Sequence, residues 1–237
     1  QFSSLLVKQI TFSFTKTLYI CTMILNTQSA LKIAESLLQI KAIKLNPTNP
    51  FQWASGWNSP IYCDNRKTLS YPPVRTYIRQ QFVDAINERY PNVEIIAGVA
   101  TGGIALGALV AEAMGLPFAY VRSASKGHGM QNMIEGDIFA DQKVVVIEDL
   151  ISTGGSSLKA VRALREHGCN ILGMVAIFTY GFDVAEKNFK ESKCDLVTLS
   201  DYDSMLKAAV SANYVSETDT DSLSEWRKSP STWTPNK

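Results

Sequence analysis

The sequence predicts an α/β fold in which a parallel sheet is flanked by helices, with a small N-terminal hood of short strands and a helix. The first observation behind this prediction is that apolar, mostly β-branched runs alternate with segments of helical periodicity. The second is that glycine-rich turns follow two of these runs, which is typical of the ligand-binding edge of a parallel sheet. The chain has 237 residues, 46% of them hydrophobic, and this is enough for one sizeable core.

The beginning of the chain differs from the rest. Residues 1–22 start without Met, carry only Lys8 and Lys16 as charged residues, and interrupt their apolar stretches before these reach the length of a signal peptide. Met23 then opens a segment typical of a cytosolic start. We interpret residues 1–22 as an extension without functional content, with a targeting segment as the alternative. Residues 23–237 are expected to form a single domain.

The predicted hood is formed mainly by residues 23–66. Apolar positions at helical spacing predict an amphipathic helix over residues 27–41. Residues 51–72 are dense in aromatic residues, Gly, Pro and Asn, which indicates short antiparallel strands rather than part of a parallel sheet. A helix over residues 72–90 follows, and two prolines suit its first turn.

The remaining elements alternate between strands and helices. Buried strands are predicted at residues 94–100, 118–121, 144–147, 171–180 and 194–200. Helices are predicted at residues 104–115, 158–168 and 183–192, and two more at the C-terminus. The polar residues 122–137 show no evident secondary structure. Such a long irregular segment is uncommon inside a compact domain and indicates a lid.

The chain is organised around residues 143–157, KVVVIEDLISTGGSS. An apolar strand is expected to end just before Glu148 and Asp149, and a turn of small and hydroxyl-bearing residues leads into a helix. This order directs backbone N–H groups and the positive helix end at one point, where a phosphate binds well. The acids add partners for sugar hydroxyls or Mg²⁺. The simpler alternative is a turn that only needs permissive backbone angles. Neither GxxxxGK[ST] nor GxGxxG is present.

A second candidate anion loop, Thr-Gly-Gly at residues 101–103, follows another buried strand at the same expected sheet edge. Two such loops suit a ligand with phosphates at both ends. The polar segment contains Arg122, Lys126 and His128. Closure of these side chains over an anionic leaving group would neutralise its charge and exclude water. The alternative is a solvated loop whose charges only face water.

Composition excludes several classes of function. The formal net charge of +1 offers no case for binding nucleic acid or a membrane surface by bulk electrostatics. The cysteines show neither C-x-x-C spacing nor a companion histidine cluster, so we expect reduced thiols in a cytosolic protein rather than zinc ligands or disulfides. They are Cys21, Cys63, Cys169 and Cys194. No apolar run reaches the roughly 18 residues of a membrane-spanning helix.

Four stretches together resemble orotate phosphoribosyltransferase, a family of the type I phosphoribosyltransferases. These stretches are SGWNSPIYCDNR at 55–66, GVATGG at 98–103, R-x-x-x-K-x-H-G at 122–129 and EDLISTGGSS at 148–157. The resemblance covers the chain from about Met23 to the C-terminus. It implies the type I phosphoribosyltransferase fold.

The resemblance also implies an activity. Members of this family transfer the phosphoribosyl group of phosphoribosyl diphosphate (PRPP) to orotate, giving orotidine 5′-monophosphate and diphosphate in de novo UMP biosynthesis. They require Mg²⁺, which we expect PRPP itself to hold for the most part, with the protein ligands unknown. The resemblance further implies a cytoplasmic homodimer that binds neither nucleic acid nor a membrane.

Site residues follow from the resemblance position by position. The lid residues that contact PRPP and diphosphate, and that are the catalytic candidates, match Arg122, Lys126 and His128. The acids at the ribose hydroxyls match Glu148 and Asp149. The loop for the 5-phosphate matches Leu150, Ile151, Ser152, Thr153, Gly154, Gly155 and Ser156. We assign the diphosphate side of PRPP to Thr101, Gly102 and Gly103. Ser152 also matches the residue that contacts orotate.

The chain departs from the pattern of the family at three places. Many members carry a basic residue where Ala54 and Ser123 stand here, and an arginine where Tyr180 and Gly181 stand. The last departure leaves the orotate carboxylate without its usual cation. We predict that Arg66, at the end of the hood segment, replaces it. The alternative is that Arg66 only pairs with a carboxylate such as Asp64.

Three other functions remain open from the sequence. The first is transfer to a purine or to uracil, because the PRPP motif is shared among such enzymes. The second is a PRPP-sensing regulator without catalysis, although no basic stripe or helix-turn-helix accompanies the domain. The third is one half of a bifunctional enzyme with the decarboxylase that acts next. We expect a monofunctional enzyme.

Overall fold

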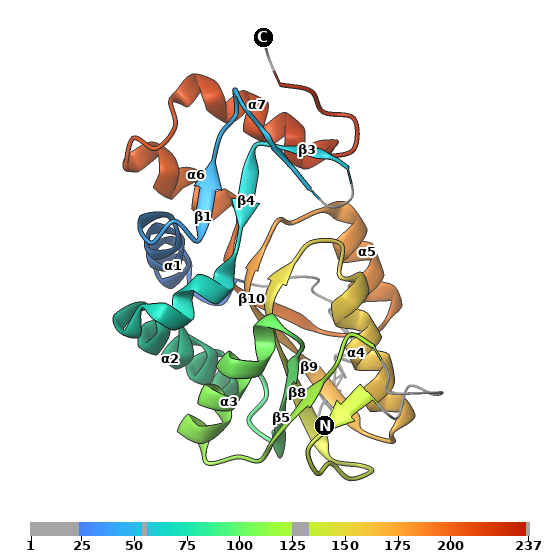
Figure 1. The fold of residues 1–237 in the computed structure, drawn as a ribbon. Helices are drawn as coiled ribbons and strands as arrows, with labels where there is room; N and C mark the ends of the chain where they lie inside the picture. Colours follow the sequence, from blue (N-terminus) through green and yellow to red (C-terminus); the bar gives the residue numbers. More distant parts are fainter. Residues whose placement is uncertain (1–23, 54–55, 125–132, 236–237) are drawn as a thin grey trace, which may run out of the picture.

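The computed structural model describes residues 24–53, 56–124 and 133–235, and within them the predicted α/β architecture is confirmed (Figure 1). The central sheet has the strand order β10-β9-β8-β5-β6-β7. Its strands are β5 (Ile95–Val99), β6 (Phe118–Val121), β7 (Ile134–Glu135), β8 (Lys143–Ile151), β9 (Asn170–Thr179) and β10 (Leu196–Asp201). Neighbouring strands pair in parallel, except that β7 pairs antiparallel with β6. This is the mostly parallel sheet that alternating strands and helices predict.

Helices cover both faces of the sheet. They are α1 (Thr27–Gln39), α2 (Pro72–Arg89), α3 (Gly102–Met114), α4 (Gly155–Glu166), α5 (Asp183–Glu191), α6 (Tyr202–Ser211) and α7 (Glu217–Lys228). Successive side chains of a strand point to opposite faces. In β8, Val145 and Ile147 pack in the core shared with α1, α2 and α3, whereas Val144 and Val146 pack in the core shared with α4 and α5. Burial on both faces explains the continuous apolar run of this strand.

The helix ends follow local chemistry. The Asn26 side chain caps α1 by accepting a hydrogen bond from the Ser29 N–H at 3.0 Å. The helix α3 ends at Gly115, whose φ of 65° is the left-handed conformation that glycine adopts readily. Ser216 and Asp219 form a capping box at the start of α7. These ends lie close to the predicted boundaries because caps depend on neighbouring residues.

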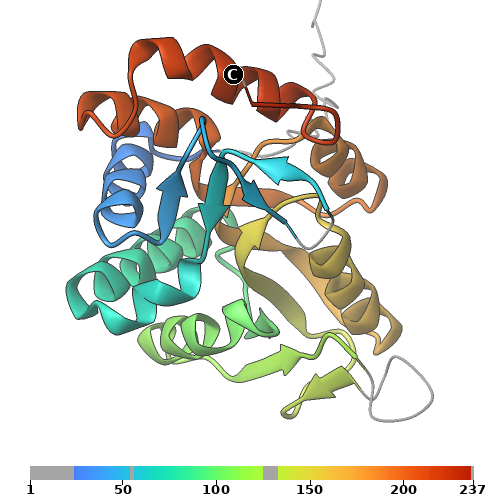
Figure 2. The ribbon, with the colours of Figure 1, turned by 45° about the horizontal axis from the view of Figure 1, so that its top comes forward.

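The hood, which comprises the short strands β1 to β4 and the 3₁₀ helix η1 (Asn65–Ser70), contains antiparallel strands as predicted. The strand β1 (Ile43–Leu45) pairs with β4 (Ile61–Cys63), and β2 (Phe51–Gln52) pairs with β3 (Asn58–Ser59). Figures 1 and 2 show α6 and α7 beside these strands at one end of the molecule. The C-terminal helices therefore pack with an N-terminal substructure.

An aromatic cluster joins the hood to the sheet and to α7. Trp53, next to β2, has its ring centroid 5.5 Å from that of Trp226 in α7 and 5.2 Å from that of Tyr180, which follows β9. Tyr180 also stacks on Phe182, with 5.4 Å between the ring centroids. Trp226 is fully buried, and its indole N–H donates to the Asn58 carbonyl of β3 at 3.2 Å. Large aromatic contacts of this kind stabilise an interface strongly.

Three boundaries differ from the prediction. The strand β8 continues to Ile151, so Glu148 and Asp149 lie within the strand and not after it. Pairing with β9 continues to Ile151 opposite Thr179, although the apolar run that signals a strand ends at Ile147. In the same way α3 begins at Gly102 and α4 at Gly155, inside the predicted loops. Glycine has poor helix propensity, and tertiary contacts override it here.

The polar segment at residues 122–137 is also more regular than expected. Its end forms β7, in which Ile134 pairs with Val121 and Glu135 with Tyr120 of β6. Residues 125–132 lie outside the described ranges. Of the described residues 122–124 and 133–137, Ile134 and Glu135 therefore form a short strand at the edge of the sheet, which the lid interpretation did not include.

The aromatic cluster leads to a prediction about stability. We expect Trp226→Ala to lower the free energy of unfolding by about 3–5 kcal/mol, because it removes a fully buried indole and leaves a cavity. Denaturant titration followed by circular dichroism would measure the change. As a control, Tyr214→Ala alters an aromatic residue that is 51% exposed, and a change within about 0.5 kcal/mol is expected. A loss below about 1 kcal/mol for Trp226→Ala would show that the cluster contributes little.

Candidate active site

Two helix N-termini meet at the carboxyl edge of the sheet. The helix α3 starts at Gly102, directly after β5, and α4 starts at Gly155, after β8. The N-cap residues Thr101 and Gly154 make no side-chain hydrogen bond to either helix. The first N–H groups of a helix have no partner within it, so both ends present donors and a positive partial charge. The two predicted anion loops thus lie at helix N-termini that flank the end of β8.

A pocket of about 340 Å³ lies between these helix ends and the hood. Its lining residues are Cys63, Asp64, Arg66, Ala100, Thr101, Gly102, Glu148, Asp149, Leu150 and Ser156. Seven of the predicted site residues therefore line one pocket: Arg66, Thr101, Gly102, Glu148, Asp149, Leu150 and Ser156. The remaining residues of the predicted phosphate loop adjoin it in the chain.

A second pocket, of about 280 Å³, lies between α1, α2 and β10. Its charged lining residues, Asp84 and Glu88, are acidic, and no lysine or arginine lines it. Acids line the first pocket too, but Arg66 and residues at the N-termini of α3 and α4 also line it. These groups attract an anion, so the first pocket is the better candidate for an anionic ligand.

Glu148 is the more deeply buried of the two predicted ribose acids, at 5% exposure. Its carboxyl oxygens accept hydrogen bonds from the Asp149 N–H at 2.9 Å and from the Ser157 hydroxyl at 2.8 Å. Burial raises the pKa of Glu148 well above its ordinary value, and the neighbouring Asp149 carboxylate adds to this shift. Asp149 is half-buried and lines the pocket. Both acids line the pocket, and Asp149 is the more exposed of the two.

The loop at residues 101–103 approaches β8 so closely that only glycine fits. A Cβ atom on Gly102 would overlap the Asp149 carboxylate, and one on Gly103 would overlap the carbonyl oxygen of Ile147. The two glycines of this loop therefore have a packing role as well as a possible ligand-binding role. They place the N-terminus of α3 against the acids.

The predicted 5-phosphate loop, residues 150–156, is held by contacts with α5 and with the residues that follow β9. Gly154 has a φ of +79°, and a Cβ there would lie 2.6 Å from a ring carbon of Phe189 in α5. The Asn188 side chain donates to the Thr153 carbonyl at 2.9 Å. The Ile151 carbonyl accepts a hydrogen bond from the Tyr180 N–H at 3.2 Å. These contacts hold the loop against α5 and the end of β9.

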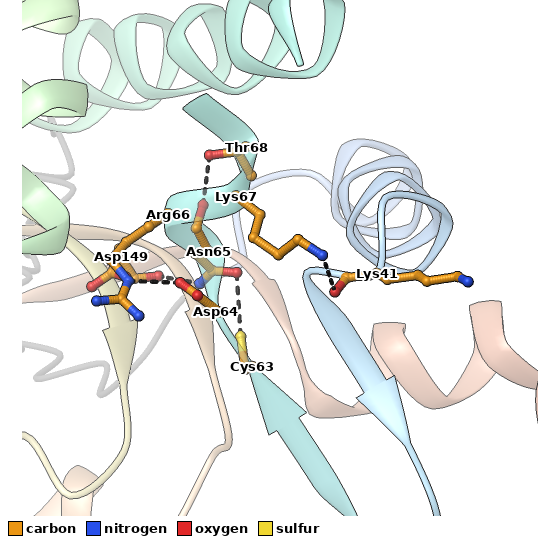
Figure 3. Close-up of polar contacts among 8 residues, drawn as sticks. All are labelled: Lys41, Cys63, Asp64, Asn65, Arg66, Lys67, Thr68 and Asp149. Carbon is orange, nitrogen blue, oxygen red and sulfur yellow. Dashed lines mark hydrogen bonds and ion pairs between the residues drawn. The ribbon is translucent and has the colours of Figure 1, made fainter. Parts of the chain in front are cut away.

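At the hood end of the pocket, Arg66 forms an ion pair with Asp64, with 2.7 Å between Nε and Oδ1 (Figure 3). The hydrogen bond from Arg66 lowers the pKa of Asp64. The Arg66 side chain is 58% exposed and lines the pocket with Asp149. The pairing considered as the alternative role is thus present, and the contact of Arg66 with orotate stays a prediction.

The predicted lid residues have different outcomes. Arg122 makes an ion pair with Glu135 of β7, at 3.4 Å between Nη1 and Oε1, and it does not line the pocket among the described residues. Lys126 and His128 lie outside the described residues. A further cation lies next to the predicted lid segment: the Lys159 ammonium of α4 donates a hydrogen bond to the Ser123 carbonyl at 2.9 Å.

The structure adds residues that sequence reasoning missed. Asn65 donates a hydrogen bond from its side-chain amide to the Asp149 carbonyl at 2.6 Å, between segments 84 residues apart. Arg227 of α7 lies close to Gly181, with Nη1 4.0 Å from where a Cβ of residue 181 would stand. The sequence signal for Asn65 was its place inside the hood motif. For Arg227 there was none, because α7 is far from the motifs in sequence.

Fold and site together define a phosphoribosyltransferase. The family of the phosphoribosyl transferase domain matches residues 73–214 of the chain. The orotate phosphoribosyltransferase of Porphyromonas gingivalis is 58% identical over 201 residues, which is 85% of this chain and 96% of that protein. The chain belongs to the orotate phosphoribosyltransferase family.

Solved structures agree on the fold. The orotate phosphoribosyltransferase of Aeropyrum pernix superimposes with a TM-score of 0.67 at 24% identity, covering 78% of this chain and 99% of that one. The adenine phosphoribosyltransferase of Leishmania tarentolae superimposes with a TM-score of 0.60 at 21% identity, covering 81% of this chain and 97% of that one. The fold alone therefore does not select the base.

The buried acid leads to a pH prediction. The folded state raises the pKa of Glu148. The protonated carboxyl therefore contributes stability that is fully present below the pKa of the unfolded chain, about 4.3. This contribution is lost as pH rises through the pKa of Glu148 in the folded state. We expect the stability of Glu148→Gln relative to the parent to increase with pH between pH 5 and pH 8, because only the parent has to keep or ionise a buried carboxyl. Urea titrations across this range, without metal, would measure it.

A matched control is Glu94→Gln. The exposed Glu94 accepts hydrogen bonds from Lys143, which lower the pKa of Glu94. The stability that Glu94→Gln loses should therefore be constant between pH 5 and pH 8 and should disappear only at the acid end. Parallel pH profiles for the parent and Glu148→Gln would contradict a raised pKa of Glu148.

Proposed function

We propose that this chain transfers the phosphoribosyl group of PRPP to orotate, giving orotidine 5′-monophosphate and diphosphate in de novo UMP biosynthesis. One observation carries the proposal: a single pocket joins two helix N-termini, the acids of β8 and the hood turn. A relative 58% identical over most of the chain bears the name of this activity. The enzyme is accordingly a pentosyltransferase.

The arrangement supports a division of PRPP into three parts. The N-terminus of α4 binds the 5-phosphate, Asp149 accepts hydrogen bonds from the ribose hydroxyls, and the N-terminus of α3 receives the diphosphate. The neutral carboxyl of Glu148 keeps the backbone of β8 in place through its bonds to Asp149 and Ser157. Holding both substrates in line accounts for much of the rate without a covalent enzyme intermediate. The lid cations stabilise the departing diphosphate.

We also propose that Mg²⁺ takes part. No group of three His, Cys, Asp or Glu side chains is arranged to hold a metal within residues 24–53, 56–124 and 133–235. Mg²⁺ is commonly bound by one or two carboxylates together with substrate phosphates, and Asp149 offers one such carboxylate in the pocket. The residues thus fit a metal that arrives with PRPP. When bound, the ion neutralises charge on the diphosphate.

A homodimer and a cytoplasmic location are further proposals that rest on the resemblance to the family. In the described part of the chain, Cys63, Cys169 and Cys194 are free thiols. No helix in that part is long and apolar enough to cross a membrane. Sedimentation of the purified protein would test the dimer.

Two cations are candidates for the orotate carboxylate. Arg66 lines the pocket beside Asp149. Arg227 lies next to Gly181, where many members of the family carry an arginine, and it pairs with Asp203 at 2.6 Å. We favour Arg66, because Arg227 is not among the pocket-lining residues.

One prediction from the proposed function concerns the reaction. We expect the purified protein to consume orotate, followed by its absorbance, when PRPP and Mg²⁺ are present, and not to consume adenine, hypoxanthine or uracil. Lys126→Ala should lower kcat by about a hundredfold or more while PRPP binding is largely retained, because a cation at the leaving group is removed. Turnover of another base would favour that acceptor, and PRPP binding without any turnover would favour the regulator.

Another prediction distinguishes Arg66 from Arg227 as the partner of the orotate carboxylate. Arg66→Ala should raise KM for orotate about tenfold or more, as expected when a charge-assisted hydrogen bond is lost. Lys67→Ala is the matched control, because the Lys67 ammonium donates to the Lys41 carbonyl on the other side of the same turn (Figure 3). An unchanged KM for orotate in Arg66→Ala, with a raised KM in Arg227→Ala, would assign the role to Arg227.

A further inference from the structure

The end of β8 that carries the two acids has a strand neighbour on one side only. Pairing with β5 stops at Ile147 opposite Gly98, whereas pairing with β9 continues to Ile151 opposite Thr179. Glu148 and Leu150 pair with β9, whereas Asp149 between them is paired with neither β5 nor β9. A backbone carbonyl in this position needs another donor.

Asn65 supplies that donor from the hood. Its side-chain amide donates to the Asp149 carbonyl at 2.6 Å, and Asn65 itself is only 1% exposed. The other end of the amide accepts a hydrogen bond from the Cys63 thiol, with 3.2 Å between Sγ and Oδ1. Figure 3 shows Asn65 between Cys63 and Asp149. The amide is therefore oriented at both ends, with nitrogen toward β8.

The thiol is suited to this orienting role. Burial raises the pKa of Cys63, and the carboxylates of Asp149 and Asp64 raise it further. The thiol therefore stays protonated at neutral pH and keeps donating to Asn65. A separate hydrogen bond, from the Thr68 hydroxyl to the Asn65 carbonyl at 2.6 Å, fixes the backbone of the turn within η1.

The neighbours of Asn65 in the chain face the pocket. Asp64 and Arg66 line it from the hood, and Asp149 lines it from the sheet. The bond between Asn65 and the Asp149 carbonyl thus joins the two walls at the point where they meet. Other contacts between hood and core, such as the bond from Trp226 to Asn58, involve residues outside this lining.

We propose that Asn65 is a positioning residue that sets the spacing between the hood turn carrying Arg66 and the end of β8 carrying the Asp149 carboxylate. The inference rests on the proposed function, since this spacing decides whether the base and the ribose are held in line. A misplacement of about 1 Å between reacting groups can lower a rate about a hundredfold. Asn65 touches neither reacting group and acts through the two walls.

The test uses Asn65→Asp in the full-length enzyme. Aspartate keeps the size of the side chain and an acceptor for Cys63, but its carboxylate cannot donate to the Asp149 carbonyl. We expect KM for orotate and KM for PRPP each to rise about tenfold or more, with a fall in kcat/KM of about a hundredfold. Thr68→Val is the control, because it removes a hydrogen bond to Asn65 from within η1 without touching β8.

The comparison separates positioning from stability. Each variant loses one buried hydrogen bond, and Asn65→Asp also buries a carboxyl group, so its Tm should fall further than that of Thr68→Val. Only Asn65→Asp should change KM. KM values for Asn65→Asp within twofold of those for Thr68→Val would overturn the proposal. If Asn65→Asp does not fold, Asn65→Ser provides the same test, because the serine hydroxyl is too short to reach β8.

Failure of the proposed function would give a different result. A parent enzyme that binds PRPP by calorimetry but turns over no base would reject orotate transfer. The role of Asn65 would then be tested by the affinity for PRPP instead of KM. Equal PRPP affinities of Asn65→Asp and Thr68→Val would still overturn that role.

Discussion

The site depends on the close approach of the loop at residues 101–103 to the strand β8. Side chains are excluded at Gly102 and Gly103, because the Asp149 carboxylate and the Ile147 carbonyl occupy the space that a Cβ would need. This approach places the N-terminus of α3 next to the acids and opposite the N-terminus of α4. Two positive helix ends around a carboxylate pair suit a ligand whose anionic ends flank a polyhydroxylated centre.

The acids themselves are not equivalent. Glu148 is buried, accepts two hydrogen bonds and has a raised pKa, whereas Asp149 is half-buried and faces the pocket. Two adjacent ionised carboxylates repel each other, and a difference in burial lets one stay protonated while the other interacts with a ligand. Glu148 thus bonds to the backbone of β8 while both acids line the pocket, and their contacts with the ribose hydroxyls stay a prediction.

The hood is attached to the sheet by two kinds of contact. The aromatic cluster around Trp226 contributes buried area and joins β9, the hood and α7. Asn65 contributes one oriented hydrogen bond at the pocket itself. The neighbours of similar fold include an adenine phosphoribosyltransferase as well as an orotate phosphoribosyltransferase, so the fold alone does not select the base.

The sequence by itself determined the order of most strands and helices along the chain, the antiparallel strands of the hood and the position of the two glycine turns at the sheet edge. Periodicity, caps and turn chemistry are local, and residues 143–157 carry their pattern within fifteen positions. Only the tertiary structure decided that β8 continues through Glu148 and Asp149, because this extension comes from pairing with β9. It also decided that Asn65 meets Asp149 and that Arg227 lies beside Gly181. Such contacts join segments distant in the chain, and their geometry depends on packing that no local pattern encodes.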